Sequence, residues 1–207
     1  MPQAEPLWTP SPETANSSNL YDFMKQASAR SGRPLEDYDA LHAWSIDDRE
    51  GFWSLIWDYC GVVGDRGERV LADGDKMPGA RFFPDAGINF AENLLARGGT
   101  GDAIVFRGED KVSRRWSWPE LREEVSRIQQ FMRDKGVKAG DRVAAMMPNM
   151  PETIAAMLAA TSLGAVWSSC SPDFGPEAIR DRFSQIEPKV LITSTCTTYN
   201  GKEVRPW

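Results

Sequence analysis

The residues best suited to chemistry lie in three polar segments, and each follows an apolar run typical of a buried strand. They are residues 147–151, 168–175 and 194–202. In a parallel sheet the carboxyl ends of the strands lie at one edge, and ligands bind beyond that edge. The three segments are therefore the first candidates for a ligand site.

The first segment, Met147-Pro148-Asn149-Met150-Pro151, does not have the glycines of a dinucleotide-binding loop. Its prolines also obstruct a pyrophosphate group, which needs free backbone N–H groups. A nicotinamide- or flavin-dependent dehydrogenase is therefore not expected.

The second segment, Ser168-Ser169-Cys170-Ser171-Pro172-Asp173-Phe174-Gly175, is rich in hydroxyl groups and precedes an expected helix. Either it holds a polar ligand, or it is an ordinary turn in which Asp173 or Gly175 caps the helix. Cys170 offers a nucleophile, but the only histidine, His42, lies in the N-terminal region with nothing to place it nearby. A catalytic pair of Cys or Ser with His is therefore not expected.

In the third segment, hydroxyl residues precede Gly201-Lys202, which resembles the end of a phosphate-binding loop. The segment has only one glycine, however, and Lys202 is followed by Glu203 instead of Ser or Thr. A Walker loop needs more glycine to bring its backbone N–H groups around a phosphate. We therefore predict a surface turn over 194–202.

Strands and helices alternate around these segments in the order of a parallel α/β sheet. The pattern predicts strands over 142–147, 165–169 and 189–193, and helices that begin at Pro151 and Pro176. Proline costs little at the first helical position, because the N–H that it removes has no partner there. Two consecutive strand–helix–strand units imply parallel strands with right-handed crossovers, hence a doubly wound sheet.

The chain before this sheet carries most of its tryptophans and predicts helices with an aromatic packing layer. Three longer helices are expected: one over 18–30, one from Ser45 to Cys60, and one from the Ser117–Glu120 capping box to Lys135. A short helix is expected within 89–95. Residues 103–107 and 112–116 are expected to form a hairpin. Residues 1–17 hold four prolines and are expected to form an extended arm that Trp8 holds against the body. The predicted fold class is α/β: an aromatic-rich helical N-terminal region followed by the first βαβαβ part of a doubly wound parallel sheet, which is incomplete.

Charge and composition exclude several classes of partner. The chain has 24 Lys and Arg against 30 Asp and Glu, a net charge of −6, and no basic run longer than Arg114-Arg115, so no nucleic acid is expected. No apolar run approaches the roughly 20 residues that cross a bilayer, and no signal peptide is recognisable, so no membrane partner and a cytoplasmic location are expected. Cys60, Cys170 and Cys196 are odd in number and have no metal-like spacing, which indicates reduced thiols.

Several motifs spread along nearly the whole chain carry a family resemblance. They are Leu7-Trp8-Thr9-Pro10, His42-Ala43-Trp44-Ser45 with 52–57, Met77-Pro78-Gly79-Ala80-Arg81, Asn89-Phe90-Ala91-Glu92-Asn93-Leu94-Leu95, Gly140-Asp141-Arg142-Val143 and 168–176. Together they resemble the N-terminal part of the adenylate-forming acyl-CoA synthetases. Residues 89–95 and 168–175 are similar to the branch that activates acetoacetate rather than the branch that activates acetate.

This resemblance implies a two-step reaction. Acetoacetate attacks the α-phosphorus of ATP-Mg to give an acyl-adenylate and pyrophosphate, and the thiol of CoA then displaces AMP. It also implies a synthetase N-terminal region over 1–97 and the start of an AMP-binding domain over 98–207. In the family, the triphosphate loop, the ribose-binding acidic residue and the adenylation lysine all come later than residue 207. The chain alone is therefore expected to be inactive, with no catalytic or metal-binding residue and no tight binding of ATP, CoA or Mg.

A contact to CoA is what the resemblance carries over to this chain. Acetate-activating relatives place paired arginines against the CoA 3′-phosphate at the positions of Tyr199 and Lys202, and here Lys202 alone keeps the positive charge. They also place a loop glycine near the CoA adenine where this chain has Asp173. Tyr199, Lys202 and Asp173 are therefore the candidate residues on the CoA side.

Other functions stay open at this point. The chain could be a non-catalytic truncated paralogue that acts as a binding module, or part of a ligase for another short-chain acid. An unfinished sheet would also offer an exposed strand edge through which the chain could associate with itself.

Overall fold

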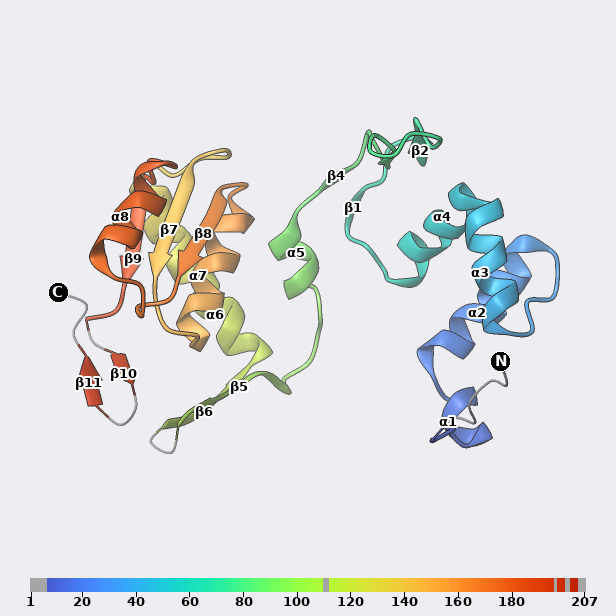
Figure 1. The fold of residues 1–207 in the computed structure, drawn as a ribbon, viewed down its shortest axis with the longest axis horizontal. Helices are drawn as coiled ribbons and strands as arrows, with labels where there is room; N and C mark the ends of the chain where they lie inside the picture. The colour runs from blue at the N-terminus through green and yellow to red at the C-terminus, as the bar shows by residue number, and fades with distance from the viewer. Residues whose placement is uncertain (1–6, 110–111, 196, 200–201, 205–207) are drawn as a thin grey trace. The chain divides into compact units, whose positions relative to one another are not determined.

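The structure, a computed structural model, describes residues 7–109, 112–195, 197–199 and 202–204. It divides into two compact units, residues 1–87 and 88–207, and each unit is described by itself. Figure 1 shows the order of the elements along the chain.

The first unit begins with helices and continues into short strands. Its elements are α1 (Pro12–Asn16), α2 (Asn19–Ser31), α3 (Tyr38–Asp47), α4 (Arg49–Tyr59), β1 (Gly64–Asp65), β2 (Leu71–Ala72) and β3 (Arg81–Phe82), and β4 (Gly87–Ile88) leads into the second unit. Strands β2 and β3 form an antiparallel pair. The short strands were not predicted, because two-residue strands leave no periodic pattern in the sequence.

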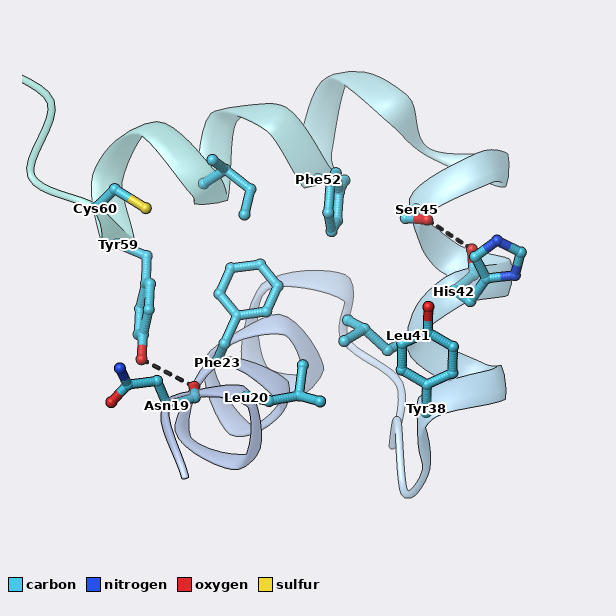
Figure 2. Close-up of a pocket in the computed structure, with 11 residues that line it drawn as sticks. Asn19, Leu20, Phe23, Tyr38, Leu41, His42, Ser45, Phe52, Tyr59 and Cys60 are labelled. Carbon is cyan, nitrogen blue, oxygen red and sulfur yellow. Dashed lines mark hydrogen bonds between the residues drawn. The ribbon is translucent and has the colours of Figure 1, made fainter. Parts of the chain in front are cut away.

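Helix α2 confirms the predicted helix over 18–30. The Ser18 side chain accepts a hydrogen bond from the Tyr21 N–H, and Gly32 ends the helix in the left-handed region at φ 69°. The inward face packs α2 against α3 and α4 in a core of Phe23, Met24, Ala27, Leu35, Leu41, Trp44 and Leu55. The ring of Phe23 meets the rings of Phe52 and Tyr59 edge to face, with centroids 5.9 and 5.1 Å apart, beside an open pocket (Figure 2).

The prediction of one helix from Ser45 to Cys60 is wrong. Two helices meet at Asp48, whose carboxylate accepts a hydrogen bond from the Gly51 N–H at 2.9 Å and so caps α4. Ser45 lies inside α3 and donates to the carbonyl of His42 at 2.7 Å. Asp48 is as good an N-cap as Ser45, and local chemistry did not distinguish them.

The extended arm predicted for residues 1–17 is also wrong over its second half. Residues 12–16 form α1, because the Ser11 side chain accepts from the Thr14 N–H and Pro12 occupies the first turn. The indole of Trp8 is 75% exposed, so Trp8 does not hold this segment against the body of the unit. Residues 1–6 lie outside the described residues.

The second unit contains the predicted hairpin, helix and parallel sheet. Its elements are α5 (Phe90–Leu95), β5 (Asp102–Gly108), β6 (Val112–Ser117), α6 (Trp118–Asp134), β7 (Arg142–Met146), α7 (Pro151–Ser162), β8 (Val166–Cys170), α8 (Pro176–Ser184), β9 (Val190–Thr193), β10 (Thr197–Tyr199) and β11 (Lys202–Val204). The capping box is confirmed, since Ser117 and Glu120 satisfy each other's backbone N–H groups at the start of α6. Strands β5 and β6 pair antiparallel, with Ile104 opposite Trp116.

Strand β7 lies between β8 and β9, and it pairs parallel with both (Figure 1). Its side chains alternate between two buried layers. Val143 packs into the core formed with α6 and α7, whereas Ala144 and Met146 pack against Phe183 of α8. Helices therefore cover both faces of β7, as the doubly wound prediction requires.

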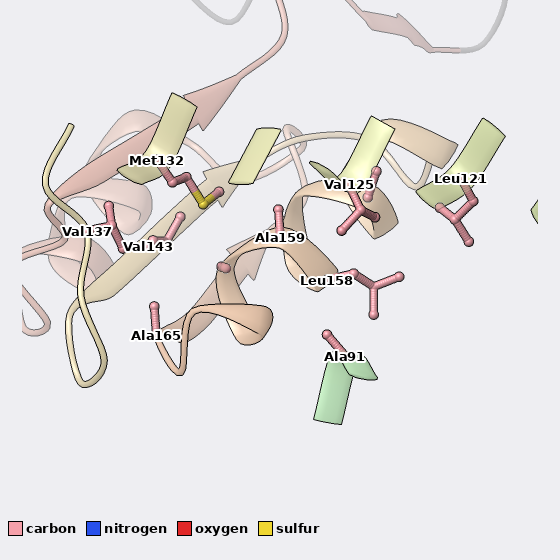
Figure 3. Close-up of a cluster of buried hydrophobic side chains, with 11 residues drawn as sticks. Ala91, Leu121, Val125, Met132, Val137, Val143, Leu158, Ala159 and Ala165 are labelled. Atoms are coloured by element: carbon pink, nitrogen blue, oxygen red, sulfur yellow. The ribbon is translucent and has the colours of Figure 1, made fainter. Parts of the chain in front are cut away.

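The larger core of this unit lies between α6, α7 and the sheet (Figure 3). It includes Leu121, Val125 and Met132 of α6. Helix α7 contributes Ala155, Ala159 and Ala160, all of which are fully buried. Alanine side chains allow α7 to lie close to the strands while α6 covers its other side.

At the amino ends of the strands, hydrogen bonds to loop carbonyls hold the chain in place. The Arg142 guanidinium donates to the carbonyl of Ile186 at 2.7 Å, just before β9. Lys189 Nζ donates to the Gly136 carbonyl at 2.6 Å and to Asp141 at 3.0 Å. These contacts fix the entry of β7 and β9 into the sheet.

Arg114 joins the hairpin to α7. Its guanidinium donates to both carboxylate oxygens of Glu152, at 2.5 and 2.8 Å, and lies over the rings of Phe106 and Trp116. The Arg114 hydrogen bonds lower the pKa of the Glu152 carboxyl, against an opposing effect of burial. Both side chains are about one-third exposed, so solvent weakens the pair without removing it.

We predict that Glu152→Gln lowers the free energy of unfolding by about 1–2 kcal/mol at pH 7, because it removes a charge-assisted double hydrogen bond that is partly screened. Since the pKa of Glu152 is lowered in the folded state, this stabilisation is complete above the ordinary glutamate value of about 4.3. It is lost as the pH falls through the lowered value. Urea unfolding between pH 3 and pH 7 measures the difference.

Glu123→Gln is the matched control, because Glu123 is an exposed residue of α6. It should leave stability within about 0.5 kcal/mol of the parent at every pH. A Glu152→Gln deficit that stayed constant down to pH 3 would contradict the assigned ion pair.

Candidate functional site

The carboxyl edge of the β8-β7-β9 sheet brings the three polar segments to one side of the unit. The chain leaves β7 toward α7 on one face and leaves β8 toward α8 on the other. In sheets wound this way, the crevice at the reversal of strand order is the usual ligand site, and here it lies beyond the ends of β7 and β9.

The loop after β7 is closed by its own hydrogen bonds. The Met147 N–H donates to the Cys170 carbonyl at 3.2 Å, and Thr153 Oγ1 donates to the Pro148 carbonyl at 2.7 Å. Pro151 occupies the first turn of α7, as predicted. The Met147 N–H is thus already engaged within the unit.

The loop after β8 contains the candidate residue Asp173. Asp173 is exposed, and one of its carboxylate oxygens lies 2.9 Å from Ser171 Oγ. Of the two predicted caps, Gly175 occupies the N-cap position of α8, and it has no side chain to hydrogen bond. The Asp173 carboxylate is therefore not engaged by α8.

An apolar pocket of about 330 Å³ adjoins this loop. Pro172 and Phe174, the two neighbours of Asp173, line it together with Met146 from the end of β7 and Leu191 from β9. Arg180 of α8 adds a positive charge to the lining. A pocket with an aromatic wall and one cation can take a flat ring next to an anionic group.

Cys170 lies at the end of β8 and is only 8% exposed. Burial raises the pKa of its thiol, and the charge of Arg182 opposes that shift to a smaller extent. The thiol therefore stays protonated at neutral pH, and Cys170 is a core residue rather than a nucleophile.

The segment after β9 is an antiparallel hairpin, not the surface turn predicted over 194–202. Strands β10 and β11 place Tyr199 directly opposite Lys202, and the Lys202 side chain is exposed. Asn200 and Gly201 of the predicted turn, and Cys196, lie outside the described residues. Thr and Tyr are residue types that favour strands, and the sequence analysis gave more weight to the polarity of the segment.

Ser194 is a candidate site residue that sequence reasoning missed. Its hydroxyl oxygen is buried at the carboxyl end of β9 and has no hydrogen-bond partner within the described part of the chain. A buried hydroxyl without a partner costs free energy, so it is a group that a ligand could satisfy. A hydroxyl residue directly after a predicted strand was the available signal.

The structure thus brings two of the three candidate residues together. Tyr199 and Lys202 are cross-strand neighbours, whereas the Asp173 carboxylate lies against Ser171 in the loop after β8. Phe174, Arg180 and Leu191 were not predicted as site residues, because their shared pocket arises only from the packing of α8 on the sheet.

No group of three or more His, Cys, Asp or Glu side chains among the described residues is arranged to hold a metal ion. No helix within the same residues has the length and apolar character needed to cross a membrane.

Comparison with known proteins agrees with this fold. Residues 95–206 match the AMP-binding enzyme family, and residues 38–94 match the acetyl-coenzyme A synthetase N-terminus family. The chain belongs to the AMP-binding enzyme family, since this match covers more than half of its length.

Within that family the chain is similar to acetoacetyl-CoA synthetases. It is 57% identical over 201 residues to acetoacetyl-coenzyme A synthetase of Rhizobium meliloti (strain 1021), covering 97% of this chain and 31% of that protein. The solved structure of acetoacetyl-CoA synthetase from Streptomyces lividans is 37% identical with a TM-score of 0.89, over 98% of this chain and 32% of that one. Malonamoyl-CoA synthetase of Penicillium aethiopicum is 37% identical, over 96% of this chain and 28% of that protein.

The chain therefore spans about a third of the length of the relatives that it matches. The predicted resemblance to the N-terminal portion of these synthetases is confirmed.

We predict that the two described thiols react at very different rates. In a Cys196→Ser background, the exposed Cys60 should react at once with a thiol reagent, and Cys170 should react only when the protein unfolds. Counting modified thiols with and without denaturant measures this. Adding Cys60→Ser should remove the fast phase alone. Two equally fast thiols in the folded protein would contradict the buried position of Cys170.

Proposed function

We propose that this chain is the N-terminal part of an ATP-dependent acetoacetate–CoA ligase, which converts acetoacetate, ATP and CoA into acetoacetyl-CoA, AMP and diphosphate. The observation that carries this proposal is 57% identity to an acetoacetyl-coenzyme A synthetase along 97% of the chain. The domains are an N-terminal synthetase region over 1–97 and the start of the AMP-binding domain over 98–207. The division into units near residue 87 and the family matches that meet at residues 94 and 95 support a boundary in this region.

In this proposal the chain supplies scaffold and part of a CoA site. In the full-length enzyme, ATP and Mg activate the acid. The residues that bind them lie beyond residue 207. Lys202 binds the 3′-phosphate of CoA by charge, and Tyr199 lies beside it in the hairpin. The pocket between α8 and the sheet takes the adenine ring against Phe174, with Asp173 at its border and Arg180 as a second cation.

One alternative rests on a specific relative. Malonamoyl-CoA synthetase is about as similar to this chain as most acetoacetyl-CoA synthetases are, so a ligase for another short-chain acid is the second candidate. A non-catalytic truncated paralogue is the third candidate, and it would bind a partner through the free edges of β8 and β9.

The free thiols of Cys60 and Cys170 support the cytoplasm as the compartment.

We predict that the 207-residue chain releases no AMP above a blank when it is given acetoacetate, ATP and CoA. The product of the reading frame extended to the relatives' length should do so, with acetoacetate preferred at least tenfold in kcat/KM over malonamate and acetate. A coupled assay of AMP release measures both. Turnover by the 207 residues alone would contradict the scaffold role, and a preference for malonamate would select the second candidate.

We also predict that Lys202→Ala in the extended protein raises the KM for CoA about tenfold, as expected for the loss of one ion pair with a phosphate. The KM for ATP should stay unchanged. Lys138→Ala is the control, because Lys138 is an exposed lysine at the opposite, amino edge of the sheet. An equal effect of both variants, or a rise in the KM for ATP, would show that Lys202 does not bind CoA.

A further inference from the structure

A positive charge lies over the ring of Phe174. The guanidinium carbon of Arg182 is 4.6 Å from the centroid of this ring. The face of an aromatic ring attracts a cation at this distance. Phe174 lies in the loop after β8, and Arg182 lies in the last turn of α8. The contact therefore ties the loop to the far end of the helix that follows it.

The backbone contacts of this loop fix the direction of the Phe174 side chain only weakly. The Phe174 N–H donates to the Ser171 carbonyl at 3.3 Å, and the Asp173 N–H donates to Ser171 Oγ at 3.4 Å. Both distances are long for hydrogen bonds of this kind. Gly175, the N-cap residue of α8, adds no side-chain hydrogen bond. The contact with Arg182 is thus a restraint that the loop itself does not supply.

Arg182 lies outside the apolar pocket that Phe174 lines. It lines a separate polar hollow of about 420 Å³ with Ser168 and Ser169 of β8, whereas Arg180 is the arginine of the apolar pocket. No carboxylate among the described residues forms an ion pair with the Arg182 guanidinium. The charge of Arg182 is therefore placed to act on the ring rather than on a molecule inside the pocket.

We propose that Arg182 is a positioning residue for CoA, because its charge holds the Phe174 ring in the orientation against which the adenine packs. This inference rests on the proposed function, which places the adenine in the apolar pocket. Without the charge, the ring is free to change rotamer, and the pocket loses its aromatic wall for part of the time. A ring that is already held lowers the entropic cost of binding. The effect falls on the binding of CoA and not on the chemical step.

Steady-state kinetics of the extended protein test this role. Arg182→Gln should raise the KM for CoA about fivefold, the size expected for one cation–π contact at the surface. The values of kcat and of the KM for ATP should stay unchanged, as expected when only binding is lost. Arg182→Lys should recover most of the loss, because an ammonium group is also attracted to a ring face.

Two analogues of CoA separate an effect on the ring from an effect on a phosphate. Dephospho-CoA keeps the adenine but has no 3′-phosphate, and Arg182→Gln should lower kcat/KM by the same factor with it. Pantetheine 4′-phosphate has no adenine, and the variant should use it as well as the parent does. A loss that needs the 3′-phosphate would mean that Arg182 binds this group, and it would overturn the proposal. An equal loss with all three thiols would reveal a general structural defect, which would overturn it as well.

Arg133→Gln is the matched control, because Arg133 is an exposed arginine in the last turn of α6, and it should leave the KM for CoA unchanged. Phe174→Ala tests the pocket itself and should raise this KM at least about tenfold, as for the loss of a ring that stacks on a base. In that background Arg182→Gln should add nothing, since it acts through the ring.

The two variants also distinguish this inference from the proposed function. A normal KM for CoA in Arg182→Gln beside a raised one in Phe174→Ala would overturn the role of Arg182 and leave the adenine pocket intact. Normal values in both variants would overturn the pocket and the inference together.

Discussion

The burial of β7 on both faces is the constraint on which the second unit depends. Val143, Ala144 and Ala145 are fully buried, so every side chain in the middle of this strand needs a cover. A parallel strand in this position is stable only when helices pack on both sides. On one face, the small alanines of α7 let that helix pack close to the strand. On the other face, the large ring of Phe183 from α8 fills the space beside the strand.

The same winding decides where the candidate ligand site lies. Because α7 and α8 lie on opposite faces, the loops before them separate at the carboxyl edge and leave the pocket beside Phe174. The two edges of the sheet differ accordingly. Hydrogen bonds from Arg142 and Lys189 hold the amino edge together, whereas at the carboxyl edge the hydroxyl of Ser194 has no partner among the described residues. The first edge stabilises the sheet, and the second holds the candidate site.

Sequence patterns predicted the elements of this unit well, since its boundaries carry strong local signals. Pro151, Pro176 and the Ser117–Glu120 capping box each mark a helix start that tertiary packing does not override. The helices of the first unit were harder to predict from sequence. Asp48 and Ser45 are equally good N-caps, and which of them begins a helix depends on how α3 and α4 pack. The site was only partly predictable. Met146, Phe174 and Leu191 come from separate elements, and no local pattern reports that they share a pocket.

The contact between Arg114 and Glu152 links two parts of the second unit that are otherwise unrelated in sequence. Glu152 lies in the first turn of α7, the same turn in which Thr153 closes the loop after β7. The ion pair therefore joins the β5–β6 hairpin to the helical turn whose next residue closes the loop after β7. The position of the hairpin and the start of α7 beside the candidate crevice are thus set by one shared contact.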